Sequence, residues 1–170
     1  QNLSASEKQY RDAVNNLDNG LNTTVNSARS ATESALRALE KAQQDYDDAR
    51  ADVDDGMNSQ LVQAEEALDQ AQLRLDFAEE DLENYETDSS TTYGGQTLRS
   101  IREAYEDAQT SRDSARKSLE LAQAAVDSQL ASYATALNEA QIAYDNALVS
   151  QQAAETSVRQ GLEDQRAALN

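Results

Sequence analysis

Apolar residues recur along this chain at alternating spacings of three and four positions, which places their side chains on one face of a helix. The pattern occupies two long stretches, residues 3–85 and residues 97–169. Because it is sustained over many heptads, it predicts a coiled-coil seam in each stretch. The seam of the first stretch consists of Leu3, Tyr10, Val14, Leu17, Leu21, Val25, Ala28, Ala35, Leu39, Ala42, Tyr46, Ala49, Val53, Met57, Leu61, Ala64, Leu68, Ala71, Leu75, Ala78, Leu82 and Tyr85. The seam of the second consists of Leu98, Ile101, Tyr105, Ala108, Ala115, Leu119, Ala122, Val126, Leu130, Tyr133, Leu137, Ala140, Tyr144, Leu148, Val158, Leu162 and Leu169, with the polar residues Arg112, Gln151 and Gln165 near seam positions.

Between the two stretches the apolar pattern stops. Residues 86–96 are rich in Ser, Thr and Asp and contain Gly94-Gly95, so they predict a loop. Thr97 then has the side chain of a helix N-cap. We therefore predict an all-α fold: one domain over 1–170, a long antiparallel two-helix coiled-coil hairpin with arms 3–85 and 97–169 and a tip loop at 86–96. At 1.5 Å per residue, the first arm would be about 125 Å long.

Two places in the first arm weaken the prediction of one continuous helix. Residues 15–24 contain Gly20 and are poor in helix formers, and residues 54–59 have the composition of one helix end followed by a new cap. Around Met57 the apolar spacing repeats steps of four, which we interpret as a stutter that unwinds the supercoil without ending the helix. The alternative fold is a bundle of three or four shorter helices.

A short phrase recurs four times: Leu, two residues, Ala-Gln, two residues, an apolar residue and Asp. It starts at Leu39, Leu68, Leu119 and Leu137, so its separations are irregular and are not a solenoid period. A large residue alternates with Ala in the seam, which allows two helices to approach closely. The Gln and Asp of the phrase are expected outside the seam.

Composition narrows the function. The chain has no Pro, 5 Gly and 38% hydrophobic residues, which suits a thin seam better than a thick core. Its net charge of −18 repels phosphate backbones and anionic lipid heads, so it predicts neither nucleic-acid binding nor peripheral membrane binding. No run of eighteen apolar residues exists, and no signal peptide is visible. Since the chain starts abruptly at Gln1 and ends within a helical pattern, we expect a fragment of a larger protein.

Catalytic and metal chemistry have few candidates. The chain has neither His nor Cys, which removes the usual general base, thiol nucleophiles and the commonest metal ligands. The acidic run before Gly56 resembles a calcium loop only superficially, because Ala51, Val53 and Val62 would occupy ligand positions. We predict no enzyme activity, no catalytic residue, no metal site and no cofactor.

The tip is the best candidate for recognition. It brings together Tyr93, Gly94, Gly95, Arg99 and Arg102, and Tyr and Arg are favoured in binding hot spots. These five residues are the predicted partner-binding site. The alternative is that the loop is an ordinary polar connector.

The phrases that start at Leu68 and Leu137 resemble the α-helical hairpin of HlyD-like membrane fusion proteins, the adaptors of export and efflux systems. In that family the hairpin is inserted between two halves of a lipoyl-like domain and projects from an inner-membrane transporter. Adaptors that dock on an outer-membrane channel carry Leu four residues after a tip Arg. Here Glu103 follows Arg99 at that spacing, so the resemblance favours an adaptor from an envelope without that channel.

The resemblance implies a connective adaptor module of a membrane transport complex, for efflux or secretion. It would lie outside the cytoplasm in the cell envelope, tethered through other parts of the protein. Its partners would be proteins, a transporter or an envelope component, and self-association through the acidic flanks is also implied because these adaptors act as rings. The alternative function is a helical-bundle protein-binding domain of a bacterial surface or secreted protein.

Overall fold

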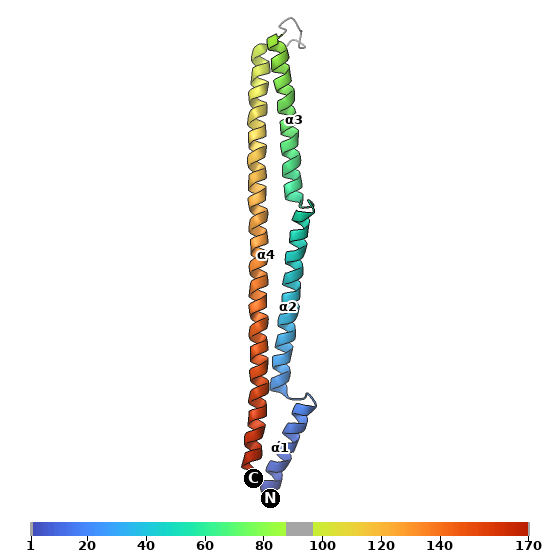
Figure 1. Ribbon diagram of the computed structural model, residues 1–170, viewed down its shortest axis with the longest axis vertical. Coiled ribbons are helices and arrows are strands. Elements are labelled where there is room, and N and C mark those ends of the chain that lie inside the picture. Colours follow the sequence, from blue (N-terminus) through green and yellow to red (C-terminus); the bar gives the residue numbers. More distant parts are fainter. Residues whose placement is uncertain (1, 88–96, 170) are drawn as a thin grey trace. The chain divides into compact units, whose positions relative to one another are not determined.

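Helices are the only regular secondary structure in the part of the chain that the computed structural model describes, residues 2–87 and 97–169 (Figure 1). Its helices are α1 (Asn2–Asp18), α2 (Thr23–Asp54), α3 (Ser59–Thr87) and α4 (Leu98–Ala168). Helices α1 to α3 form the first arm and pack against α4, which forms the second. This confirms the predicted all-α hairpin.

The helices form two compact units. One unit contains residues 1–47 and 132–170, and the other contains residues 48–131. Helices α2 and α4 contribute to both units. In each unit, first-arm residues pair with α4.

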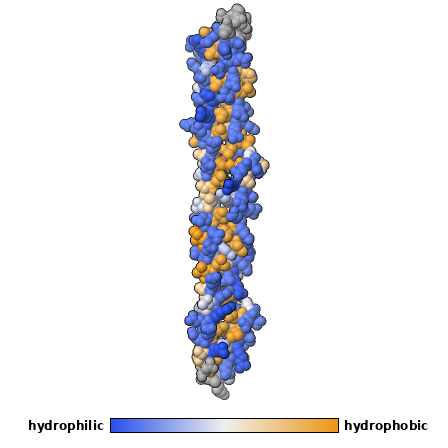
Figure 2. Space-filling model, viewed as in Figure 1, coloured by the Kyte–Doolittle hydropathy of each residue, from blue (hydrophilic) through white to orange (hydrophobic). Residues whose placement is uncertain are grey.

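The core is a thin line of small and medium-sized side chains between the paired helices. Further apolar side chains reach the surface among the polar ones, as orange among blue in Figure 2. In the unit of residues 48–131, the buried side chains are Ala71, Leu75, Ile101 and Val126. In the other unit they are Val25 and Thr32. Because the described residues include no large side chain that is fully buried, the helices are held by a seam rather than by a filled interior.

The predicted seam is confirmed at almost every position whose burial the structure describes. Only Leu21 and Met57, each 63% exposed, lie outside it. Both residues occupy the turns where the first arm is interrupted. Of the polar residues expected near the seam of α4, Arg112 and Gln151 are half-buried, whereas Gln165 is exposed.

The first interruption of the arm is a Schellman turn that ends α1. Gly20 has a φ of 67°. The Leu21 amide donates to the Asn16 carbonyl (2.7 Å) and the Gly20 amide to the Leu17 carbonyl (3.1 Å), which is the hydrogen-bond pattern of this motif. The usual apolar contact of the motif is missing because Asn16 is polar, and Leu21 is left exposed.

The second interruption has the same geometry and corrects the predicted stutter. Gly56 also has a φ of 67°. The Met57 amide donates to the Asp52 carbonyl (2.8 Å) and the Gly56 amide to the Val53 carbonyl (3.1 Å). The helix therefore ends here instead of only unwinding. A residue with a positive φ cannot continue a helix, and Gly adopts this conformation without the strain of a β-carbon.

An asparagine side chain starts the next helix after each turn. The Asn22 carboxamide oxygen accepts from the Val25 amide at 3.1 Å, and that of Asn58 accepts from the Leu61 amide at 3.2 Å. These bonds satisfy amides that have no partner inside the helix. The first arm is therefore three helices joined by two cap-to-cap turns, not the single helix predicted over residues 3–85.

The two turns belong to a repeat of 36 residues, a period that the irregularly spaced phrase did not indicate. Residues 17–25 and 53–61 share the order apolar, Asp, Asn or Asp, Gly, apolar, Asn, Ser or Thr, any residue, apolar. The seam continues in the same register after each turn. Identical seam residues 36 positions apart are Ala28 and Ala64, Ala35 and Ala71, Leu39 and Leu75, and Ala42 and Ala78.

Helix α4 begins as predicted. The Ser100 amide donates to the Thr97 hydroxyl (3.3 Å) and the Thr97 amide to the Ser100 hydroxyl (3.1 Å), so each residue caps the other. From there α4 runs 71 residues without a break. Gly161 lies inside it and does not interrupt it.

The recurring phrase has a structural role on the exposed face of the helices. Its Gln and Asp side chains are four residues apart and form hydrogen bonds of 3.0 Å in Gln43–Asp47, 2.8 Å in Gln72–Asp76 and 3.0 Å in Gln141–Asp145. Such pairs stabilise a helix by a few tenths of a kcal/mol each, about 0.2–0.5. The expectation that these residues lie outside the seam is confirmed.

Substitutions of glycine should affect stability differently in the two turns and in the continuous helix α4. Gly20→Ala and Gly56→Ala should each lower the free energy of unfolding by about 1 kcal/mol, because each places a β-carbon at a positive φ. Gly161→Ala is the matched control. Its β-carbon would meet nothing within 4 Å inside a helix, so it should stabilise by about 0.5–1 kcal/mol. Equal effects of all three in urea denaturation would contradict the turns.

Small residues in the seam should resist enlargement. Ala71 is 7% exposed, so Ala71→Leu should overpack the seam and cost about 1–3 kcal/mol. Ala122→Leu, at a half-buried seam position of α4, should act in the same direction. Ala67→Leu, on the exposed face of α3, is the control and should change stability by less than about 0.5 kcal/mol. The seam register would be wrong if thermal melts showed the same midpoint for Ala71→Leu and Ala67→Leu.

Candidate interaction site

The predicted recognition residues lie around the connection between α3 and α4. Arg99 and Arg102 are in the first turns of α4. Tyr93, Gly94 and Gly95 lie outside the described residues. The structure therefore places only the two arginines of the predicted set.

The two arginines have different surroundings. Arg102 Nη2 lies 3.5 Å from Glu86 Oε1, so this ion pair joins the end of α3 to the start of α4. Arg99 Nε lies 2.9 Å from Glu103 Oε1, one turn further along the same helix, and the Arg99 side chain is 88% exposed. Arg99 is thus the more available for a partner, whereas Arg102 also pairs with a residue at the end of the other helix.

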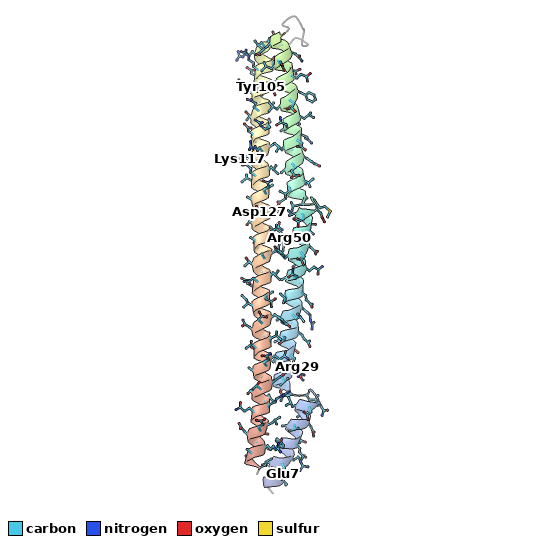
Figure 3. The ribbon with its side chains drawn as sticks, viewed as in Figure 1. Glu7, Arg29, Arg50, Tyr105, Lys117 and Asp127 are labelled. Atoms are coloured by element: carbon cyan, nitrogen blue, oxygen red, sulfur yellow. The ribbon has the colours of Figure 1, made fainter. Side chains whose placement is uncertain are left out.

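A second ion pair between helices lies in the other unit. Arg29 Nη2 of α2 is 3.1 Å from Glu155 Oε1 of α4, and the Gln151 side-chain amide donates to the same carboxylate oxygen at 3.2 Å (Figure 3 labels Arg29). The hydrogen bond from Gln151, followed by that from Arg29, lowers the pKa of Glu155 below its ordinary value. Seven further ion pairs among the described residues each join two residues of the same helix.

Thr32 places a polar group in the seam of the same unit. It is 8% exposed, and its Oγ1 lies 3.1 Å from the Ala28 carbonyl oxygen and 3.2 Å from the Ala147 carbonyl oxygen of α4. A buried polar side chain of this kind favours one alignment of two helices over its neighbours. Sequence reasoning passed over Thr32 because the apolar series steps from Ala28 to Ala35.

Charge is distributed unevenly between the arms. Residues 2–87 carry 20 acidic and 7 basic side chains, a net charge of −13, whereas residues 97–169 carry 11 acidic and 7 basic, a net charge of −4. The first arm is therefore the face that would attract a basic partner. No group of three acidic side chains in the described ranges is arranged to hold a metal ion. None of the described helices is apolar enough over a sufficient length to cross a bilayer.

No family model, curated protein or solved structure matches this chain. The likeness to the membrane fusion hairpin therefore depends on the heptad phrases alone.

Lowering the pH should reveal the contribution of Glu155. Because its pKa is depressed in the folded state, the pair stabilises the fold above the ordinary Glu pKa of about 4.3, and this stabilisation is lost as the pH falls through the lower folded value. Glu155→Gln should lower the melting temperature slightly at pH 7, by a few degrees at most, because the pair is near the surface. The difference from the parent should shrink as the pH falls below the ordinary Glu pKa of about 4.3, and it should disappear once the pH is below the lower folded pKa.

The control for this measurement is Glu139→Gln, an exposed change in the same helix. It should leave the melting temperature unchanged at both pH values. A Glu155→Gln deficit that persists undiminished at pH 3 would show that the carboxylate charge is not the cause.

Proposed function

We propose that this chain is the connective hairpin module of an adaptor in a membrane transport complex for efflux or secretion. In this role it presents the loop end of the hairpin to a protein partner, a transporter or another envelope component. It acts outside the cytoplasm, tethered by other parts of the protein, and assembles with further copies of itself.

The observation that carries this proposal is the pairing of first-arm helices with the continuous helix α4 along a thin seam. Burial is confined to that seam, and the exposed faces are helical and largely polar. An arrangement of this kind suits holding two sites apart more than enclosing a substrate. The phrase that repeats in both arms adds the likeness to adaptor hairpins.

A second candidate is favoured by the uneven charge. The net charge of −13 on the first arm would suit a binding domain of a bacterial surface or secreted protein, in which the sides of the helices bind a basic partner. In that case the loop would be a connector only. The first proposal predicts that mutations at the loop reduce function, and the second predicts that they have no effect.

The loop should be tested in the full-length protein with Tyr93→Ala combined with Arg99→Ala. Arg102 is kept because its pair with Glu86 joins α3 to α4. The double variant should reduce transport and recovery of the assembled complex by about tenfold, since Tyr and Arg at a hot spot each contribute 1 kcal/mol or more. Helix content measured by circular dichroism should not change.

Arg116→Ala is the matched control. Arg116 pairs with Glu120 one turn along α4, as Arg99 does with Glu103, but lies farther from the loop in sequence. It should transport normally. If the folded Tyr93/Arg99 variant also transports normally, the loop is a connector and the acidic first arm becomes the candidate surface.

A further inference from the structure

A groove opens between α3 and α4 in the unit of residues 48–131. Its volume is about 480 Å³. Small side chains create it: Ala78 on α3 faces Ala104, Ala108 and Ser111 on α4. Ile101, which is 2% exposed, also lines the groove and gives it an apolar base.

A large apolar side chain borders this groove. Phe77 lines it and is 58% exposed, and Leu73, one turn earlier on α3, is 54% exposed. Residues four apart lie on the same face of a helix, so the two side chains form one ridge. Single exposed apolar residues are ordinary, but a ridge beside a hollow is an apolar surface of the kind that binds a partner. The sequence signal is two bulky residues at helical spacing that lie off the seam.

The groove also carries charges that the described chain does not neutralise. Arg74, Asp81 and Asp107 line it, and none has an ion-pair partner among the described residues. The arginines between residues 99 and 116 of α4 differ from Arg74, because each has an ion-pair partner: Arg99, Arg102, Arg112 and Arg116. Helix α3 as a whole carries nine acidic residues and one basic residue, Arg74.

We infer that this groove binds an amphipathic helix of a protein partner. One apolar side chain of that helix enters the hollow over Ile101 and packs against Phe77. Lys or Arg residues of the helix meet the carboxylates of Asp81 and Asp107. This is helix-in-groove recognition, with the apolar contact supplying affinity and the charges fixing orientation.

Charge favours a basic amphipathic helix in the groove over a second copy of this chain, an anionic lipid or a nucleic acid. A second copy of this chain would bring an equally acidic α3 against the first, and like charges oppose that contact. Anionic lipids and nucleic acids are repelled for the same reason. The inference does not depend on the proposed transport role, because the groove would bind a basic helix whatever complex the chain belongs to.

The chain contains no Trp, which provides a clean measurement. The probe is an amphipathic peptide of 18 residues made of Leu and Lys with one Trp on its apolar face. Trp emission then comes from the peptide alone, and burial in the groove should shift it to shorter wavelength. Titrations in about 0.3 M salt suppress non-specific attraction between the peptide and the acidic surface. A peptide with Glu in place of Lys should not bind.

Variants of the groove test where the peptide binds. Phe77→Ala removes the ridge, and Ala104→Gln narrows the hollow. Each should weaken the affinity for the peptide about tenfold. Asp107→Asn should weaken it by a few-fold and reduce its salt dependence. The controls are Leu121→Ala, a change at a 64% exposed apolar residue outside the groove, and Asp127→Asn on the same helix (Figure 3), which should both bind within twofold of the parent.

Three results would overturn the inference. The first is equal binding by Phe77→Ala and Leu121→Ala, with unchanged melting temperatures. The second is equal binding of the Lys and Glu peptides. The third is a dimer of the chain alone, detected by light scattering and abolished by Phe77→Ala, which would make a second copy the occupant.

Discussion

The packing of two helices at the alanine positions of the seam, where small side chains permit a close approach, is the interaction on which the rest of the structure depends. Each pairing is only one side chain thick, so it has no deeper core to compensate for a fault. Ala71 at 7% and Leu75 at 6% exposure show the alternation of a small and a large residue that makes this approach favourable. The polar seam residue Thr32, which is bonded across the seam to the Ala147 carbonyl, then favours one alignment among several similar ones.

A thin seam must also keep the same face toward its partner, and the two arms meet this requirement differently. From Val25 to Val53, with Thr32 counted as a seam position, the seam advances in eight steps over 28 residues, or 3.5 per step. On a straight helix, a seam with this spacing rotates around the helix axis by about 20° per heptad, hence by roughly 80° over this length. The turn at Gly56 falls where two steps of four, from Val53 to Met57 and from Met57 to Leu61, bring the average from Val25 to Leu61 to 3.6 residues per step. In α4, with Arg112 counted as a seam position, ten steps from Ile101 to Leu137 cover 36 residues, or 3.6 per step, and the helix continues without a break.

The seam, the hairpin class and the Thr97 cap could be predicted because each follows from residue spacing or from a local cap. The two turns could be suspected from Gly20 and Gly56, but spacing alone could not distinguish a stutter at Met57 from a helix end. That choice depends on several hydrogen bonds around one positive φ, and the copy 36 residues away is the signal that would have settled it. The groove beside Phe77 could not be predicted from the sequence, because a hollow depends on which side chains of two helices face each other. The predicted site was also only partly predictable. The position of Arg102 near the loop follows from the sequence, but its ion pair with Glu86 of α3 does not.

Small-angle X-ray scattering tests the central claim most directly, because a hairpin and a folded bundle with the same helix content differ in length. An unbroken α4 of 71 residues rises about 1.5 Å per residue, so the account predicts a maximum dimension above roughly 100 Å. A maximum dimension near 50–60 Å would mean that the arms fold back into a compact bundle, and it would contradict the hairpin.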